Sequence, residues 1–257
     1  MASRAGRQTA LASYVLHHYD WSESSVILDL FTREQGRIAV AAKGAKRPFS
    51  QLRSVLLPFQ RLQVSLGRVP PGADAREVHT LRAADWAGGH PMLTGAALFS
   101  GFYLNELLMK LLARHDPHAA LFDAYAETVA TLTRSDEAGT QAALRAFELV
   151  LLREIGLLPD LGTETASHRS VRADRRYLVL ADAGVVETDN ENEATVSGAT
   201  LSALEMALAV DLTSLQQVAA RALAELRPLL RAQLHYHLGT SQLRTRQVMI
   251  EAQALDR

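Results

Sequence analysis

The chain has 257 residues, of which 48% are hydrophobic and 21% are charged, and it contains no cysteine. This length allows a substantial core and more than one domain, and the composition is that of an ordinary globular protein. The absence of cysteine excludes disulfides, thiolate zinc sites, iron–sulfur clusters and a cysteine nucleophile.

No apolar run reaches the roughly 18 to 20 residues that span a bilayer, so we expect no membrane contact. The apolar stretch after Arg4 and Arg7 resembles a signal peptide only faintly, because His17, His18 and Asp20 interrupt it. We therefore expect a cytoplasmic protein.

The formal net charge of −1 conceals an uneven division along the chain. Residues 1–85 contain 12 Lys and Arg against 7 Asp and Glu, a charge of +5. The remaining residues contain 15 against 21, a charge of −6. A basic N-terminal part favours contact with a polyanion such as a nucleic acid.

Short segments rich in β-branched and aromatic residues are predicted as strands in the first part of the chain. They cover residues 13–19, 25–32, 37–42, 60–66 and 77–81. Five short strands in roughly 75 residues favour a small closed barrel, and the OB-fold is the common five-stranded form. We therefore expect residues 1–85 to form an OB-fold domain that binds DNA.

Apolar residues repeat at helical spacing from residue 91 onward. Helices are predicted from about residue 91 to 112 and over residues 121–132, 140–158, 200–210, 214–237 and 241–254. A hairpin pattern at 177–188 interrupts them. The predicted class is α+β. An OB-fold barrel precedes an α-helical domain (residues 86–159 and 199–257) that contains an inserted β-hairpin module (residues 160–198).

The loop that follows residue 42 is the leading candidate for a binding segment. Gly44 and Pro48 argue against a helix, so its cations lie on a connector, where binding groups are usually displayed. Phosphates attract such cations, and unpaired bases stack on aromatic rings. The candidate DNA ligands are Arg37, Lys43, Lys46, Arg47, Phe49 and Arg53.

The aromatic residues of this part leave alternatives open. Phe49 is either an exposed stacking platform or a plug for the barrel end. Tyr19 and Trp21 pose the same question and favour a structural role, whereas Phe31 and Phe59 are expected in the core.

Enzyme motifs are missing from the sequence. There is no P-loop, no Gly-x-Gly-x-x-Gly and no Gly-x-Ser-x-Gly. A metal-dependent nuclease would need a carboxylate cluster such as Asp20, Glu23 and Asp29, but turn chemistry explains Glu23 without catalysis. The histidines lack metal-binding spacing. We therefore expect a protein that is not an enzyme.

Short motifs with a characteristic order run through most of the chain. They are SESSVILDLFT (22–32), Gly36-Arg37, Lys43-Gly44-Ala45, Leu57-Pro58-Phe59, FSGFYLNELL (99–108), LRAFE (144–148), GLLP (156–159), Leu238-Gly239 and LRTR (243–246). Together they resemble the bacterial recombination mediator RecO family. The resemblance implies an N-terminal OB-fold, a helical domain, a small inserted module and no nucleotide hydrolysis.

The resemblance also implies partners. Family members bind single- and double-stranded DNA and anneal complementary strands. They engage the C-terminal tail of the single-stranded DNA-binding protein. With RecR, and often RecF, they help to load RecA on gapped DNA. This role implies a location at the nucleoid. The alternative is a protein adaptor that binds the acidic tail without touching DNA.

Arg145 is the residue that the resemblance assigns to the tail, which is acidic and ends in Phe with a terminal carboxylate. A receptor for it needs a guanidinium and an apolar pocket. The ordinary alternative is an intrahelical pair of Arg145 with Glu148 or Gln141. Arg244 and Arg246 extend a basic surface toward the DNA or the tail, or are simply solvated.

One departure from the family concerns zinc. Many members carry a four-cysteine zinc module near what is here 160–190, but this chain has no cysteine. His168 alone cannot build a tetrahedral site. We therefore expect no zinc and no other cofactor, and an insertion that folds on the hairpin at 177–188 alone.

Overall fold

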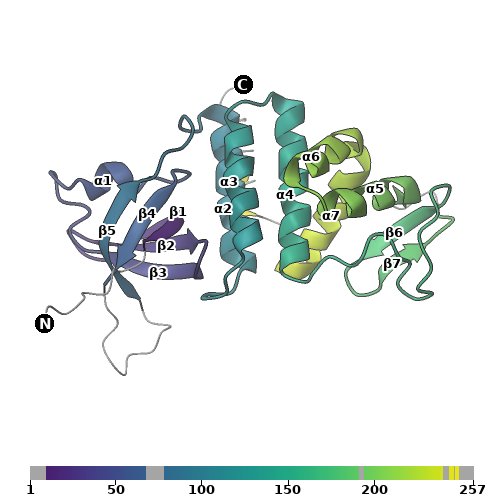
Figure 1. Cartoon of the computed structure of the whole chain (residues 1–257), viewed down its shortest axis with the longest axis horizontal. Helices are drawn as coiled ribbons and strands as arrows, with labels where there is room; N and C mark the ends of the chain where they lie inside the picture. The colour runs from purple at the N-terminus through teal and green to yellow at the C-terminus, as the bar shows by residue number, and fades with distance from the viewer. Residues whose placement is uncertain (1–9, 68–77, 191–193, 240–242, 246, 249–257) are drawn as a thin grey trace, which may run out of the picture. The chain divides into compact units, whose positions relative to one another are not determined.

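The computed structural model describes residues 10–67, 78–190, 194–239, 243–245 and 247–248 (Figure 1). The chain divides into two compact units. We call residues 1–93 with 107–123 the barrel unit, and residues 94–106 with 124–257 the helical unit. Segments 107–123 and 160–198 therefore belong to the barrel unit and the helical unit, respectively.

A closed five-stranded barrel forms the first unit and confirms the predicted OB-like fold. Around the barrel the strands follow the order β1-β2-β3-β5-β4, and only β3 and β5 run parallel. The elements are β1 (Leu11–Asp20), β2 (Val26–Thr32), β3 (Gly36–Ala42), the short helix α1 (Leu52–Val55), β4 (Leu62–Leu66) and β5 (His79–Trp86). Strand β5 extends beyond the predicted 77–81.

Both faces of the first half of β1 are buried. Val15 faces the barrel interior, where it joins the apolar cluster that includes Leu28 and Ile38. Tyr14 and Phe31 each lie 5.3 Å, ring centre to ring centre, from Phe122 at the start of α3. Adjacent strand residues point to opposite faces, so the barrel has an inner core and a second core against residues 107–123. Phe31 and Phe59 are buried, as predicted.

The turn between β2 and β3 touches this second segment directly. Gly36 has φ +68°, and a Cβ built there would lie only 1.9 Å from the carbonyl oxygen of Asp116. The amide of His115 donates to the carbonyl of Arg37 at 2.9 Å. Only glycine combines this backbone conformation with such a close approach.

Six helices lie in the described residues of the helical unit and of segment 107–123. They are α2 (Gly95–Leu111), α3 (Ala119–Leu132), α4 (Glu137–Glu154), α5 (Gly198–Leu208), α6 (Leu212–Arg221) and α7 (Leu223–Leu238). The prediction of one helix over 214–237 is wrong, because Ala222, with φ −112° and ψ 17°, separates two helices. The helix predicted over 140–158 begins earlier, since the Asp136 side chain caps it. Most of the helix predicted over 241–254 lies outside the described residues.

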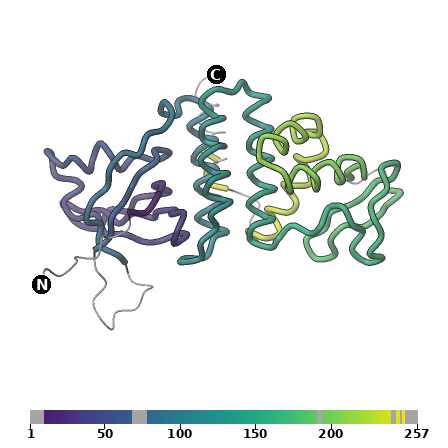
Figure 2. The backbone as a smooth tube through the Cα atoms, in the orientation of Figure 1, coloured from purple at the N-terminus to yellow at the C-terminus, as the bar shows by residue number. Residues whose placement is uncertain are grey.

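The insertion contains the predicted hairpin and one additional short strand. Strands β6 (Arg176–Leu180), β7 (Gly184–Glu187) and β8 (Val196–Ser197) form a sheet with the order β7-β6-β8. Figure 2 traces the backbone of this insertion. In the loop before β6, Thr165 exchanges hydrogen bonds of 2.9 and 2.8 Å with Val185. Backbone pairing and loop contacts thus hold the insertion together.

Candidate nucleic-acid interface and partner pocket

The loop after β3 is built from successive turns. Gly44 has φ +74°, and its carbonyl accepts from the amide of Arg47 at 3.2 Å. The carbonyl of Arg47 in turn accepts from the amide of Ser50 at 3.0 Å. We call residues 43–53, the last two of which lie in the first turn of α1, the basic loop. Most of its side chains are exposed, whereas Ala45 joins the core of the barrel.

Three of the predicted DNA ligands on this loop are exposed cations. Lys43, Arg47 and Arg53 are exposed, and none of them forms an ion pair within the part of the chain that the structure describes. Phe49 is 99% exposed, so of the two alternatives the plug is wrong and the exposed ring is confirmed. An exposed ring among cations offers both a stacking face and a phosphate-binding charge.

Lys46 lies on the same loop but has partners. Its ammonium group pairs with the Asp20 carboxylate at 2.8 Å and donates to the carbonyl of Ser22 at 3.1 Å. The backbone amide of Lys46 donates to the carbonyl of Ser24 at 3.0 Å. The hydrogen bond from the Lys46 ammonium group to the Asp20 carboxylate, together with the Lys46 charge, lowers the pKa of Asp20. Lys46 therefore connects the basic loop to the turn between β1 and β2.

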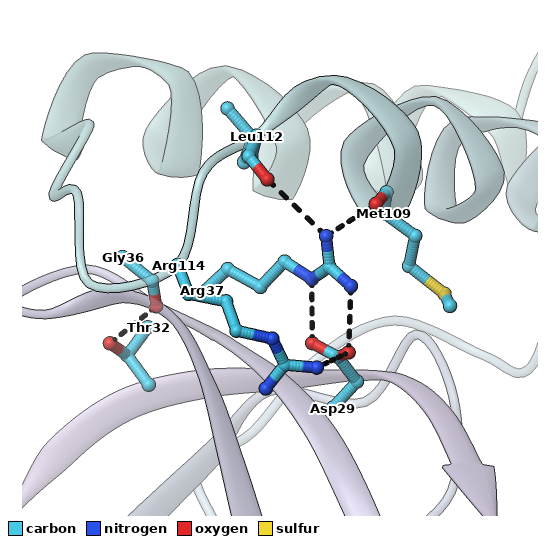
Figure 3. A network of polar contacts seen from close by, with 7 residues as sticks. All are labelled: Asp29, Thr32, Gly36, Arg37, Met109, Leu112 and Arg114. Atoms are coloured by element: carbon cyan, nitrogen blue, oxygen red, sulfur yellow. Dashed lines mark hydrogen bonds and ion pairs between the residues drawn. The ribbon is translucent and has the colours of Figure 1, made fainter. Parts of the chain in front are cut away.

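Arg37 differs most from the expectation, because its guanidinium is only 13% exposed and binds within the barrel unit (Figure 3). Its Nε and Nη2 donate to the two carboxylate oxygens of Asp29 at 2.8 and 2.9 Å. Its Nη1 donates to the carbonyls of Met109 and Leu112, at the end of α2. A cation at a helix C-terminus satisfies carbonyls that lack partners within the helix. We therefore remove Arg37 from the displayed DNA ligands.

Asp29 is buried in β2 and accepts from two arginines. Besides Arg37, the Nη2 of Arg114 donates to it at 2.9 Å. This arrangement explains a carboxylate in an apolar strand without catalysis. It also disfavours the nuclease alternative, and the described residues contain no group of three metal-ligating His, Asp or Glu side chains.

The helical unit contains a cavity of about 540 Å³ beside α4 and α7. Apolar side chains and three arginines share its wall. The lining residues include Phe99, Leu144, Pro228, Leu234, Leu243, Arg145, Arg227 and Arg231. We call this cavity the arginine pocket. The prediction from sequence missed Arg227 and Arg231, although their spacing of four on a helix places both on one face.

Arg145 combines the two alternatives that the sequence left open. It lines the pocket, and its Nη2 also pairs with Glu148 Oε1 at 2.7 Å. The hydroxyl of Tyr103 donates to the same oxygen at 2.6 Å. Burial raises the pKa of Glu148, although Arg145 and Tyr103 act in the opposite direction. Burial and the Glu148 charge raise the pKa of Tyr103 well above 10.0, so this hydroxyl remains a donor.

The C-terminal segment contributes to the same pocket. Leu243 and Thr245 line it, and the Glu106 carboxylate accepts from the amides of Arg244 and Thr245, each at 2.9 Å. The Arg244 side chain is exposed. Arg246 lies outside the described residues.

An OB-like barrel that presents exposed cations and an aromatic ring is typical of nucleic-acid-binding proteins. The comparisons with known proteins agree with this class. Family models for the N-terminal and C-terminal parts of recombination protein O match residues 7–87 and 92–247. The chain belongs to the RecO family of DNA repair and recombination proteins.

Curated relatives named DNA repair protein RecO match nearly the whole chain. The relative from Variovorax paradoxus is 52% identical over 254 residues, which cover 95% of this chain and 96% of the relative. The relative from Delftia acidovorans is 49% identical over 262 residues, with coverage of 99% and 100%. These names describe DNA repair and mention no catalytic activity. Among the described helices, none is long and apolar enough to cross a membrane.

Proposed function

We propose that this protein binds single- and double-stranded DNA through the basic loop and anneals complementary strands without catalysing a chemical reaction. The observation that supports this most directly is the exposure of Lys43, Arg47, Arg53 and Phe49 on one loop. Cations neutralise phosphates and leave the base edges available for pairing. An annealing surface needs both properties.

We further propose that the arginine pocket binds the C-terminal tail of the single-stranded DNA-binding protein. Such a tail requires a guanidinium for its terminal carboxylate and an apolar wall for its last ring. Arg145 supplies the first, and Phe99, Leu144 and Leu234 supply the second. Arg227 and Arg231 add positive charge for the acidic residues of the tail.

The remaining partners follow from family membership. We propose that the protein acts with RecR, and with RecF where present, to help RecA load on gapped DNA in the cytoplasm. It would do so without zinc, because the family's zinc position lacks cysteine here, and we propose no other cofactor.

The DNA proposal is tested by fluorescence anisotropy of a labelled single strand across a salt series. Each phosphate contact to a single strand contributes about 0.7 to the slope of log affinity against log salt. The variant Lys43→Ala/Arg47→Ala/Arg53→Ala should therefore lower this slope by about 2 and slow annealing. A matched control, Arg134→Ala/Arg169→Ala/Arg221→Ala, removes three exposed cations from the helical unit and should change neither.

Equal slopes for wild type and the loop variant would contradict the proposal. Negligible DNA binding by the wild type at low salt would favour the adaptor alternative.

The tail proposal is tested with a labelled acidic peptide that ends in Phe. Arg145→Glu should weaken peptide binding at least tenfold and leave binding to naked DNA unchanged, because it reverses the charge only in the pocket. Arg134→Glu, an exposed position on the helical unit, is the matched control. A peptide with an amidated C-terminus should bind wild type weakly. Unchanged affinity of Arg145→Glu for the free-acid peptide would refute this site.

A further inference from the structure

The far end of β1 leaves the core and presents aromatic side chains to solvent. Residues Leu11–Leu16 are buried, whereas the last four residues of the strand, 17–20, are exposed. Trp21 follows directly and is 54% exposed. An exposed indole offers a flat face on which an unpaired base can stack, and in Trp21 this face lies next to a turn that contacts the basic loop.

This turn is joined to the basic loop by a set of short contacts. The Lys46 ammonium group holds the residues on both sides of Trp21, namely the Asp20 carboxylate and the Ser22 carbonyl. The amides of Gly44 and Lys46 donate to the Ser25 hydroxyl at 3.3 Å and the Ser24 carbonyl at 3.0 Å. Trp21 therefore lies in a turn that directly contacts the basic loop, which also carries Lys43, Arg47 and Phe49.

We infer that Trp21 forms a second stacking position for unpaired bases in addition to Phe49, and that Lys46 is a positioning residue for the Trp21 turn. This inference rests on the proposed DNA binding by the basic loop. It corrects the expectation that Trp21 is structural, and it gives Lys46 a different role from Lys43 and Arg47.

Electrostatics supports this division of roles. The Asp20 side chain is exposed beside Trp21, and its charge alone would repel a phosphate. The pairing with Lys46 neutralises it and so allows a strand to approach the ring. Lys46 is occupied by this contact, whereas Lys43 and Arg47 have no ion pair among the described residues.

Stacking also predicts which nucleic acid is preferred. A single strand has unpaired bases whose faces can stack on a ring, whereas the bases of a duplex are already stacked on one another. Trp21 and Phe49 should therefore favour single strands, while the cations bind both forms. Selectivity for single strands then comes from the rings, and salt-dependent affinity comes from the charges.

The chain contains two tryptophans, which makes the inference measurable. Trp86 is 63% exposed, and its Nε1 donates to Gln60 at 3.2 Å. Trp86 in β5 pairs with Leu62 in β4, and Leu62 in turn pairs with Ser13 near the start of β1. Ser13 and Asp20 are about 23 Å apart at 3.3 Å per residue, so Trp86 lies far from the Trp21 turn. Trp86→Phe leaves Trp21 as the only indole, and Trp86→Ala is the matched control.

The first experiment titrates Trp86→Phe with oligothymidylate and follows tryptophan fluorescence. We expect strong quenching with the single strand and much weaker quenching with a duplex of equal length. The second compares anisotropy of wild type, Trp21→Ala, Trp21→Phe and Trp86→Ala. Trp21→Ala should lose about 5- to 150-fold in single-strand affinity, with an unchanged salt slope and nearly unchanged duplex affinity. Trp21→Phe should be intermediate, and Trp86→Ala should match wild type.

Lys46 is tested by rescue. Lys46→Ala should weaken single-strand binding, and adding Asp20→Asn should restore part of it, because the unpaired carboxylate is then gone. If Lys46 were instead a phosphate ligand, the double variant would remain weaker than Asp20→Asn alone.

The inference is overturned if Trp21→Ala binds single strands as tightly as wild type, or if Trp86→Phe shows no quenching. It also fails if Asp20→Asn restores nothing. In these cases a loop variant with a reduced salt slope would still support the proposed function. Absence of any DNA binding by wild type would overturn both.

Discussion

The basic loop and the arginine pocket both collect cations, but they do so in opposite environments. On the loop, Lys43, Arg47 and Arg53 are exposed and unpaired among the described residues. In the pocket, Arg145 is 13% exposed and is already paired with Glu148. Exposed charges attract any polyanion, and the range of this attraction shortens as the salt concentration rises. A partly buried charge binds only a ligand that fits the pocket and compensates the cost of removing water from both charges. The comparison predicts a salt-sensitive, general DNA surface and a less salt-sensitive, selective peptide site.

A third environment is the buried pair of Asp29 and Arg37, and removing it should give the largest effect. Asp29→Asn leaves the largely buried Arg37 guanidinium without its counter-ion, which should cost about 3–5 kcal/mol of unfolding free energy. Asp123→Asn, which breaks the exposed pair with Arg33, is the matched control and should change stability little. Urea denaturation measures both. Equal losses would show that burial does not distinguish these cations.

Two turn glycines test whether the basic loop is packed against the rest of the barrel unit. Gly36 and Gly44 share a positive φ, but only Gly36 touches backbone across the turn. Gly36→Ala should cost about 3 kcal/mol, because the backbone of Asp116 must move. Gly44→Ala should cost about 1 kcal/mol from conformation alone. Thermal unfolding of the two variants compares them, and a larger loss for Gly44→Ala would mean that the loop is packed.

Loss of the Glu106 contacts at the pocket wall should have a smaller effect than the two changes above, and it should affect tail-peptide affinity. Glu106→Ala removes the acceptor for the amides of Arg244 and Thr245, so Leu243 and Thr245 lose their anchor. We expect about a fivefold loss of tail-peptide affinity, which is equivalent to about 1 kcal/mol, the net contribution of a typical hydrogen bond. Isothermal calorimetry measures the peptide, and anisotropy should show unchanged DNA binding. A change in DNA binding alone would place this segment on the DNA surface.

The smallest effect concerns pH. Burial raises the pKa of Glu148 in the folded protein above its ordinary 4.5, so the folded state holds this proton more tightly than the unfolded state. The contribution to stability is therefore present below pH 4.5 and is lost as pH rises through the raised pKa. Relative to Glu148→Gln, wild type should become less stable over that window. Urea midpoints at a series of pH values measure this, and a difference that grows toward low pH would refute it.

The same protonation should affect the pocket. A neutral Glu148 releases Arg145 for a ligand carboxylate, so tail-peptide affinity should rise as pH falls through the raised pKa. The other groups that face this carboxylate are Tyr103 and Arg145, and His235 also lines the pocket. His235→Asn serves as the control for imidazole protonation. The rise should persist in that variant and disappear in Glu148→Gln.

The sequence predicted the barrel well, because alternation of polar and apolar residues and turn residues are local signals. The break at Ala222 was missed since neither glycine nor proline marks it. The role of Arg37 could not be predicted, because the carbonyls that it binds lie more than 70 positions away in the chain. The sequence identifies a cationic side chain, but only the fold shows whether it is already paired within the protein.

The same limit applies to the sites. Exposure of Phe49 and pairing of Lys46 depend on how two turns meet, and neither leaves a signature in residue spacing. Arg145 was expected from a motif, whereas Arg227 and Arg231 come together with it only through the packing around α7.

The contact between Gly36 and Asp116 has a consequence for how this chain can be divided. A fragment that ends after β5 would keep every strand of the barrel, yet it would lack Phe122, Arg114 and the helix end that Arg37 binds. Such a fragment would expose Tyr14 and Phe31 and leave the charge of Asp29 only partly compensated. The barrel unit is therefore discontinuous in sequence. Its second core can form only after residue 122 has been synthesised.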